Sequence, residues 1–201
     1  MSALPGRPVE PQVCVYCASS RSADPEYREA AFRLGVTLAQ AGIGIVYGGG
    51  SRGSMGALAD GALSRGGRVR GILPRFMGAV ECGHSGITEL TLVEDIRTRK
   101  HLMLSQSQAA IALPGGSGTL DELLEAITLK RLGLYLHPIV LVNTRNYFRH
   151  FIELMRSVVE ERFMHERHLD MWQLVDTPEE VPAALEQAQS WSPEALSFAS
   201  V

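Results

Sequence analysis

The chain has few lysines: of its 19 lysine and arginine residues, only Lys100 and Lys130 are lysines. This scarcity leaves few amines for Schiff-base chemistry, whereas arginine is suited to bidentate recognition of phosphate and carboxylate groups. The net charge is −3, and the basic residues are dispersed along the sequence. We therefore expect neither a nucleic-acid partner nor a polybasic contact with membranes, and we expect small-molecule ligands instead.

Long hydrophobic runs are missing as well. No segment approaches the length of a membrane-spanning helix, and residues 1–12 contain three prolines without the apolar stretch of a signal peptide. The cysteines number three, which is not an even disulfide framework and suits a reducing compartment. These features predict a cytoplasmic protein without membrane association, with a flexible N-terminus at residues 1–12.

The sequence offers no convincing metal or redox motif. Cys14 and Cys17 have the spacing of a redox pair, but they lie in an expected strand, where residues three apart face opposite sides, so core packing is favoured. His165 and His168 form HxxH, whereas zinc binding on one helix face requires HExxH. We expect no metal site, and surface or packing roles for these histidines.

The arrangement of the chain predicts one α/β domain. With 201 residues, of which 45% are hydrophobic, the chain can bury roughly 70% of its unfolded surface. We expect a single domain over 13–190 and a C-terminal tail over 191–201. Strands are expected near 13–17, 43–47, 69–73, 87–93, 109–113 and 139–142, with helical patterns between them and after the last. This alternation predicts a Rossmann-like, doubly wound parallel sheet with helices on both faces and ligands at the carboxyl ends of its strands.

The segment 111–122, IALPGGSGTLDE, is the most informative stretch. Pro114 ends a strand, and the glycines that follow allow close backbone approach to a ligand. Thr119 is expected to be the N-cap of a helix over 119–132, whose free N–H groups and dipole favour an anion such as a 5′-phosphate. An alternative is that Thr119 and Glu122 form a capping box, in which Glu122 has only a structural role.

A second glycine loop covers residues 48–53. Its pattern GxGxxG follows a strand and precedes a helix, as in dinucleotide-binding proteins. The ribose-binding acid of such proteins is missing, because Leu73, Pro74 and Arg75 follow the next strand, and no GxxxxGK[ST] motif is present. We therefore disfavour an NAD enzyme and a P-loop triphosphatase, and we interpret this loop as a second wall of a mononucleotide cleft. The irregular segment 75–86 is expected to be a lid or a cleft wall.

Arg97, Arg99 and Lys100 form a positive cluster at an expected helix start, where the helix dipole disfavours cations. An anionic substrate or Glu122 would explain this cluster. A solvated charged face remains the alternative.

Taken together, YGGG at 47–50, MG at 55–56, RK at 99–100 and PGGSGTLDE at 114–122 make the chain resemble the LOG family over about 13–163. These proteins are the cytokinin riboside 5′-monophosphate phosphoribohydrolases, long mislabelled as lysine decarboxylases. The two lysines here lie beside Arg99 and Arg131, and neither is convincingly placed for a Schiff base.

The resemblance implies a homodimer, without metal or redox cofactor, that hydrolyses the N-glycosidic bond of adenine-type nucleoside 5′-monophosphates such as AMP or isopentenyl-AMP. Arg99 and Glu122 become the catalytic pair, and Gly116 to Thr119 hold the phosphate. The substrate-binding residues implied by the resemblance and the glycine loops are Ser19, Ser20, Gly48, Gly49, Gly50, Glu81, Lys100, Gly115, Gly116, Ser117, Gly118, Thr119 and Thr128.

The residue types suit this chemistry, because a carboxylate can stabilise the oxocarbenium-like state formed when a ribosyl–base bond breaks. Glu122 fits that role, while Arg99 can either stabilise the departing base or hold Glu122 ionised. The chain departs from the family pattern mostly around the cleft and the expected dimer-facing helix, at Ala18, Ser54, Arg97, Leu129 and Arg131. These departures leave a preference for a prenylated base open. A non-catalytic nucleotide-binding or carrier module of the same fold is the competing function.

Overall fold

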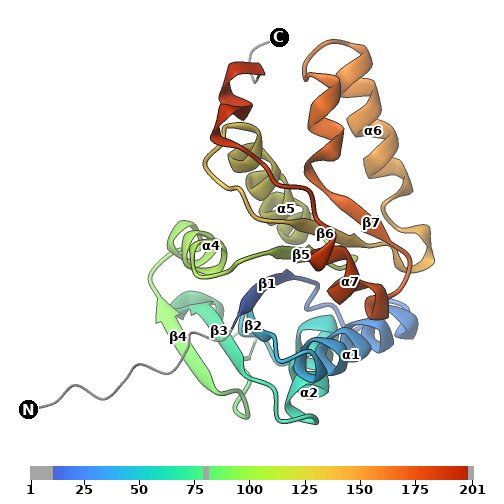
Figure 1. Ribbon diagram of the computed structural model, residues 1–201. Coiled ribbons are helices and arrows are strands. Elements are labelled where there is room, and N and C mark those ends of the chain that lie inside the picture. Colours follow the sequence, from blue (N-terminus) through green and yellow to red (C-terminus); the bar gives the residue numbers. More distant parts are fainter. Residues whose placement is uncertain (1–10, 79–81, 199–201) are drawn as a thin grey trace, which may run out of the picture.

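The computed structural model describes residues 11–78 and 82–198. In this part of the chain, parallel strands form a seven-stranded sheet in the order β4-β3-β2-β1-β5-β6-β7 (Figure 1). The strands are β1 (Gln12–Tyr16), β2 (Gly44–Tyr47), β3 (Val69–Pro74), β4 (Glu89–Val93), β5 (Ala110–Ala112), β6 (Ile139–Val142) and β7 (Gln173–Val175). The predicted doubly wound parallel sheet is confirmed, and β7 is a strand that the sequence did not reveal.

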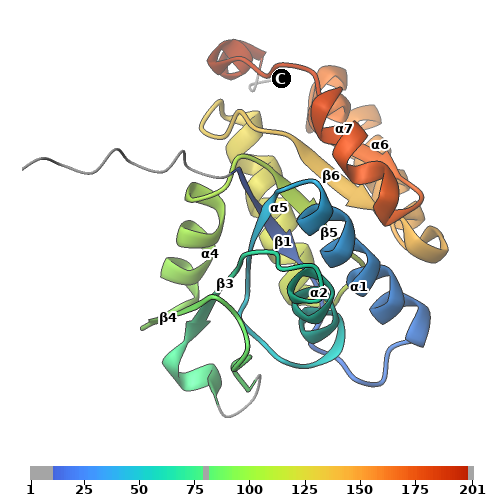
Figure 2. The same ribbon diagram turned by 60° about the horizontal axis from the view of Figure 1, so that its bottom comes forward.

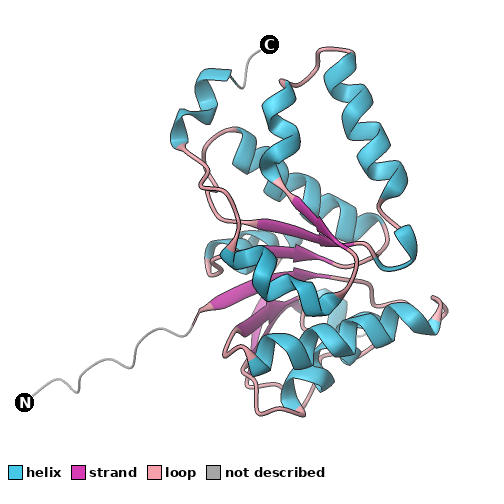
Figure 3. Cartoon of the chain, turned by 45° about the vertical axis from the view of Figure 1, so that its right-hand side comes forward, coloured by secondary structure: helices cyan, strands magenta, loops and turns pink. Residues whose placement is uncertain are grey.

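Helices connect and cover these strands (Figure 3). The α-helices are α1 (Pro25–Gln40), α2 (Gly53–Leu63), α4 (Ile96–Ser105), α5 (Ser117–Arg131), α6 (Arg149–Glu160) and α7 (Val181–Glu186). Short 3₁₀ helices are η1 (Arg75–Met77), η2 (Thr144–Asn146), η3 (Glu166–Met171), η4 (Pro178–Glu180) and η5 (Pro193–Phe198).

The sheet is packed on both faces, so its inner strands contribute alternate side chains to two cores. One core contains residues of α1, α2 and α7, and the other contains residues of α4, α5 and α6. Helices α1 and α2 lie side by side on the first face (Figures 1 and 2). Cys17 belongs to the first core and Cys14 to the second, and neither is in a disulfide, which confirms that this pair packs in the core on opposite faces of the sheet.

Acidic side chains cap two of the helices. Asp24 accepts a hydrogen bond from the backbone N–H of Glu26 at 3.0 Å and, with Pro25, begins α1. Asp95 accepts from the N–H of Thr98 at 2.7 Å and begins α4. This hydrogen bond is the main reason that the pKa of Asp95 is lowered.

The start of α5 differs from the prediction. Its N-cap is Gly116, in an extended conformation, so Thr119 is the third residue of the helix and not its N-cap. Glycine is an acceptable N-cap because it adopts this conformation without strain, and the helix can therefore begin two residues earlier, at Ser117. The capping box proposed for Thr119 and Glu122 is excluded by this change of register.

The strand order places two loops together at the centre of the sheet. From β1 the chain builds outward through β2, β3 and β4, and it then returns to the other side of β1 with β5, β6 and β7. The carboxyl ends of β1 and β5 are therefore adjacent at the point where the order reverses, which is where ligands bind in open α/β sheets.

The segment after α7 packs against the domain. The Trp191 indole N–H donates to the Lys130 carbonyl at 2.8 Å, and Ala195 in η5 is buried. Within the described ranges, no helix is both long and apolar enough to cross a membrane. Residues 1–10 of the expected flexible N-terminus and 199–201 of the expected tail lie outside the described residues.

Candidate functional site

A cavity of about 270 Å³ lies at the carboxyl ends of β1 and β5, close to the lower end of the ~300–1,000 Å³ range of small-molecule sites. The segment after β1, the 3₁₀ helix η1 and the helices α2, α4 and α5 contribute to its wall. Its lining residues are Cys17, Ala18, Ser19, Ser20, Met55, Met77, Ile96, Arg99, Lys100, Gly116, Gly118, Thr119, Asp121 and Glu122. The structure thus brings both residues of the predicted catalytic pair and part of the predicted phosphate loop into one cavity.

Glu122 lies in the second turn of α5 and lines this cavity with only 9% of its surface exposed. A carboxylate so deep in the protein is exceptional, because burial disfavours the charged form unless other groups compensate. Since Gly116 is the N-cap of α5, Glu122 does not serve as a capping-box residue for Thr119.

Arg99 projects from α4 and is 5% exposed. Its Nη2 donates to the Gly48 carbonyl at 2.9 Å, and its Nη1 donates to Met77 Sδ at 3.5 Å. A Cβ atom at position 48 would lie 2.0 Å from Nη2, so glycine is required there for the guanidinium to reach the backbone. The glycine loop after β2 therefore sets the position of Arg99.

The charges of Glu122 and Arg99 act on the same buried group beneath the cavity. Burial and then the negative charge of Glu122 raise the pKa of Cys14, while Arg99 acts in the opposite direction. Burial and then Cys14 likewise raise the pKa of Tyr16. The Cys14 thiol and the Tyr16 hydroxyl are thus neutral at physiological pH.

The loop from Gly115 to Thr119 presents the N-terminus of α5 to the cavity. The first N–H groups of a helix have no partner within the helix and, with the helix dipole, favour an anion. A Cβ at Gly115 would lie 2.1 Å from Thr119 Oγ1, so the loop folds tightly over the first turn. Gly116, Gly118 and Thr119 line the cavity, whereas Gly115 and Ser117 are not among its lining residues.

Two further segments close the cavity wall. Ser19 and Ser20 lie just beyond β1 and line the cavity, and the N–H of Met55 at the start of α2 donates to the Ala18 carbonyl at 3.1 Å. Gly48, Gly49 and Gly50 are buried and are not lining residues. Their loop is held by residues 82–84, because Gly50 pairs with Gly83 in an antiparallel bridge and the His84 N–H donates to the Gly49 carbonyl at 3.0 Å.

The positive cluster does not act as one unit. Lys100 Nζ lies 2.9 Å from Asp121 Oδ2 and 2.6 Å from Glu125 Oε2, while Arg97 is exposed. Desolvation alone would lower the pKa of Lys100, but its hydrogen bonds to Glu125 and Asp121 outweigh this effect and raise it. The ion-pair partners of Lys100 are therefore carboxylates other than Glu122.

The predicted substrate residue Thr128 lies outside this cavity. Thr128 is exposed and lines a second groove, of about 640 Å³, between α4 and α5. Lys100 lines both this groove and the cavity. Glu81 lies outside the described residues.

The sequence did not reveal the apolar side of the cavity. Met55, Met77 and Ile96 line it together with the acidic Asp121. Met77 belongs to η1, within the segment 75–86 that was expected to be a lid or a cleft wall, and it lines the cavity. A methionine in an irregular segment carries no sequence signal for a binding site, because methionine fills gaps in most cores.

The histidine pair has a structural role. His168 Nδ1 accepts a hydrogen bond from the His165 N–H at 3.1 Å, and burial lowers the pKa of His168 to about 4. In the described ranges, no cluster of His, Cys, Asp and Glu side chains could hold a metal ion.

Comparisons with known proteins give matches over most of the chain. Residues 55–185 match the family model described as possible lysine decarboxylase. The cytokinin riboside 5′-monophosphate phosphoribohydrolase LOG7 of Arabidopsis thaliana is 42% identical to this chain, over 76% of the chain and 70% of that protein. The cytokinin riboside 5′-monophosphate phosphoribohydrolase of Rhodococcoides fascians is 38% identical, over 79% of the chain and 80% of that protein.

Solved structures share the fold. The molybdenum cofactor carrier protein of Chlamydomonas reinhardtii superposes with a TM-score of 0.69, covering 89% of this chain and 98% of that chain at 20% identity. At this identity the likeness concerns the fold alone. The family-model match and the curated relatives reach further, and they show that this chain belongs to the LOG family of cytokinin riboside 5′-monophosphate phosphoribohydrolases.

Proposed function

We propose that this protein hydrolyses the N-glycosidic bond of adenine-type nucleoside 5′-monophosphates and releases the free base and ribose 5-phosphate. The observation that carries this proposal is the position of Glu122, a buried carboxylate in the same cavity as the N-terminus of α5 and the Arg99 guanidinium. The names of the curated relatives support the same reaction.

In the proposed mechanism, the N–H groups at the start of α5 bind the 5′-phosphate and thereby hold the ribose over Glu122. Glu122 stabilises the positive charge that develops on the ribose as the bond to the base breaks, and it orients the attacking water. Arg99, held by the Gly48 carbonyl, stabilises negative charge on the departing base. Because binding of the phosphate positions the sugar, nucleosides without phosphate should react poorly.

The base is proposed to lie against the apolar side of the cavity, which Met55, Met77 and Ile96 form. Flexible methionine side chains adapt to different shapes, so this wall is compatible with both AMP and isopentenyl-AMP. The two lysines are unsuited to a Schiff-base decarboxylase, because Lys100 is paired with two carboxylates and Lys130 is buried against the His137 carbonyl at 2.7 Å.

We further propose that the protein acts in the cytoplasm as a homodimer through the groove between α4 and α5. This groove exposes apolar side chains, including Ile96 at 37% and Leu124 at 43% of their surface. It adjoins the catalytic cavity through Lys100, so a second copy seated there would lie next to the site.

Product analysis tests the proposed reaction. Purified protein incubated with AMP or isopentenyl-AMP should release base and ribose 5-phosphate in equal amounts, measured by liquid chromatography. If the protein binds the nucleotide but releases no base, the proposal fails and a nucleotide-binding or carrier function takes its place.

A further inference from the structure

The turn after β6 has an unusual backbone. Arg145 and Asn146, in η2, adopt φ angles of 57° and 56°, so two consecutive residues other than glycine are left-handed. Such conformations are uncommon outside glycine and persist where neighbouring contacts over-determine them. The turn lies at the carboxyl end of its strand, on the same edge of the sheet as the catalytic cavity.

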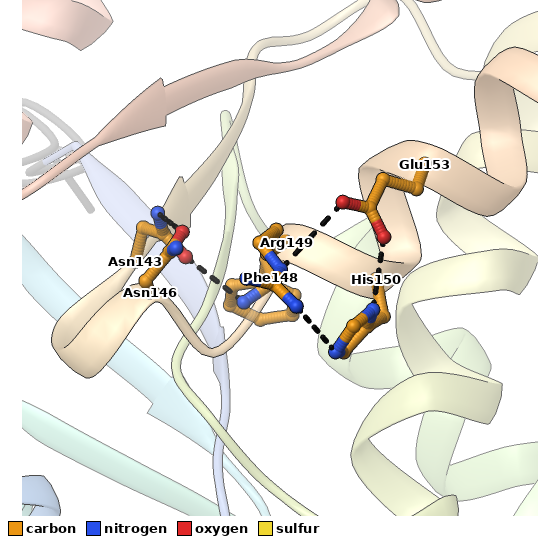
Figure 4. Close-up of polar contacts among 6 residues, drawn as sticks. All are labelled: Asn143, Asn146, Phe148, Arg149, His150 and Glu153. Carbon is orange, nitrogen blue, oxygen red and sulfur yellow. Dashed lines mark hydrogen bonds and ion pairs between the residues drawn. The ribbon is translucent and has the colours of Figure 1, made fainter.

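The Asn143 side chain holds the inner side of this turn (Figure 4). Its Oδ1 accepts from the Phe148 N–H at 2.9 Å, and its Nδ2 donates to Asn146 Oδ1 at 3.1 Å. The Asn146 N–H also donates to the Asn143 carbonyl at 2.8 Å. The buried Asn143 side chain thus joins the turn to the start of α6. Arg149, His150 and Glu153 form a separate surface cluster on that helix.

The outer side of the turn is tied to α1. Arg145 Nη1 lies 3.2 Å from Asp24 Oδ2 and 3.0 Å from Glu26 Oε2. Its guanidinium carbon also lies 5.9 Å from the centre of the Tyr27 ring. Contacts on two sides therefore fix the left-handed residues, and with them the direction of the next residue, Tyr147.

Tyr147 extends from this turn to the phosphate loop. Its hydroxyl donates a hydrogen bond to the Gly115 carbonyl, and its ring packs edge-on against Tyr27 and Phe148. Gly115 immediately precedes Gly116, the N-cap of α5, and folds tightly over Thr119. The hydroxyl therefore holds the carbonyl at the base of the loop, so that the following N–H groups keep their direction toward the cavity.

We propose that Tyr147 is a positioning residue for the phosphate loop. This inference rests on the proposed function, because it assigns to the loop the 5′-phosphate of the nucleotide. Tyr147 acts through the Gly115 carbonyl and not by contact with the substrate. Its effect is therefore confined to the part of binding that depends on phosphate.

Tyr147→Phe is the direct test, because it removes the hydroxyl and leaves the aromatic ring. The matched control is Tyr135→Phe, since Tyr135 is buried and its hydroxyl has no hydrogen-bond partner among the described residues. We expect Tyr147→Phe to weaken binding of AMP and raise its KM by about threefold to tenfold, the loss of one hydrogen bond, with little change in the weak binding of adenosine. Asn143→Ala should act in the same direction, because it releases the turn that carries Tyr147.

Binding and turnover are measured separately. Isothermal titration calorimetry with AMP, inorganic phosphate and adenosine measures the binding that depends on the phosphate loop. Base release measures the reaction. If wild-type protein binds AMP without hydrolysis, the proposed function fails, but a selective loss of AMP binding in Tyr147→Phe still supports the positioning role. Equal affinity of wild-type and Tyr147→Phe protein for AMP, equal losses of AMP and adenosine binding, or no AMP binding by wild-type protein would overturn it.

Discussion

Arg99 reaches the Gly48 carbonyl with a 2.9 Å hydrogen bond, although 51 positions separate the two residues in the chain. This contact joins α4 to the loop after β2 and orients a buried guanidinium beside Glu122 in the cavity. The glycine loop therefore positions one member of the proposed catalytic pair through its backbone, and its buried residues do not need to touch the substrate.

Gly48→Ala should displace Arg99, because the added Cβ would lie 2.0 Å from Nη2. We expect kcat/KM for AMP to fall on the order of 10- to 100-fold, as when a catalytic group moves by about 1 Å. Gly78→Ala is the control, since a Cβ there meets nothing within 4 Å. Steady-state kinetics of both variants measure the effect, and unchanged activity in Gly48→Ala would show that the position of Arg99 is unimportant.

The two lysines should titrate far apart. Burial lowers the pKa of Lys130 to about 8, whereas the hydrogen bonds of Lys100 to Glu125 and Asp121 raise its pKa above the usual value despite desolvation. An NMR titration of protein labelled at lysine side chains would show two signals, which Lys100→Arg assigns. Titration of both signals above pH 10 would contradict the buried environment of Lys130.

The lowered pKa of Lys130 also affects the free energy of unfolding. The unfolded chain binds the Lys130 proton up to its ordinary pKa of 10.5, but the folded chain releases it near pH 8. Between these values the unfolded state holds more protons, so this lysine makes the free energy of unfolding rise with pH. Lys130→Met should remove that rise, and urea unfolding at pH 7.5 and pH 10 measures it.

Leu124→Glu should prevent the proposed dimer. Leu124 is 43% exposed in the groove between α4 and α5, and a charge in an apolar interface is costly to bury. We expect wild-type protein to sediment as a dimer and the variant to sediment as a monomer at micromolar concentration. Leu154→Glu is the control, because Leu154 is 60% exposed on α6, away from this groove. A wild-type monomer would refute dimerisation, and an unaffected dimer in Leu124→Glu would refute this interface.

Much of the fold was predictable because it depends on local patterns. Alternating apolar strands and helices indicated the parallel sheet, and Asp24 followed by Pro25 marked the start of α1. The start of α5 was misplaced, since the sequence offers two capping possibilities and only the backbone geometry of Gly116 decides between them. The short strand β7 was missed because Gln173–Val175 is too short to show the alternation of apolar and polar residues that marks a strand.

The charged part of the cavity was predictable, because Arg99 and Glu122 follow motifs at known spacing. The cavity's apolar wall was not, since Met77 comes from an irregular segment and reaches Arg99 only in the folded chain. The hydrogen bond between Tyr147 and Gly115 was equally hidden, because it depends on a left-handed turn at residues that are not glycine. Contacts between distant segments leave little trace in one sequence.

The most direct test of the central claim is Glu122→Gln, which removes the negative charge and keeps the shape of the side chain. We expect release of base from AMP to fall by about 100-fold or more, the scale of losing one electrostatic stabiliser, while AMP affinity changes little. Parallel base-release assays and calorimetric titrations with AMP measure both quantities on the same protein. Full turnover in Glu122→Gln, or equal loss of turnover and AMP binding, would contradict a catalytic carboxylate beside a separate phosphate site.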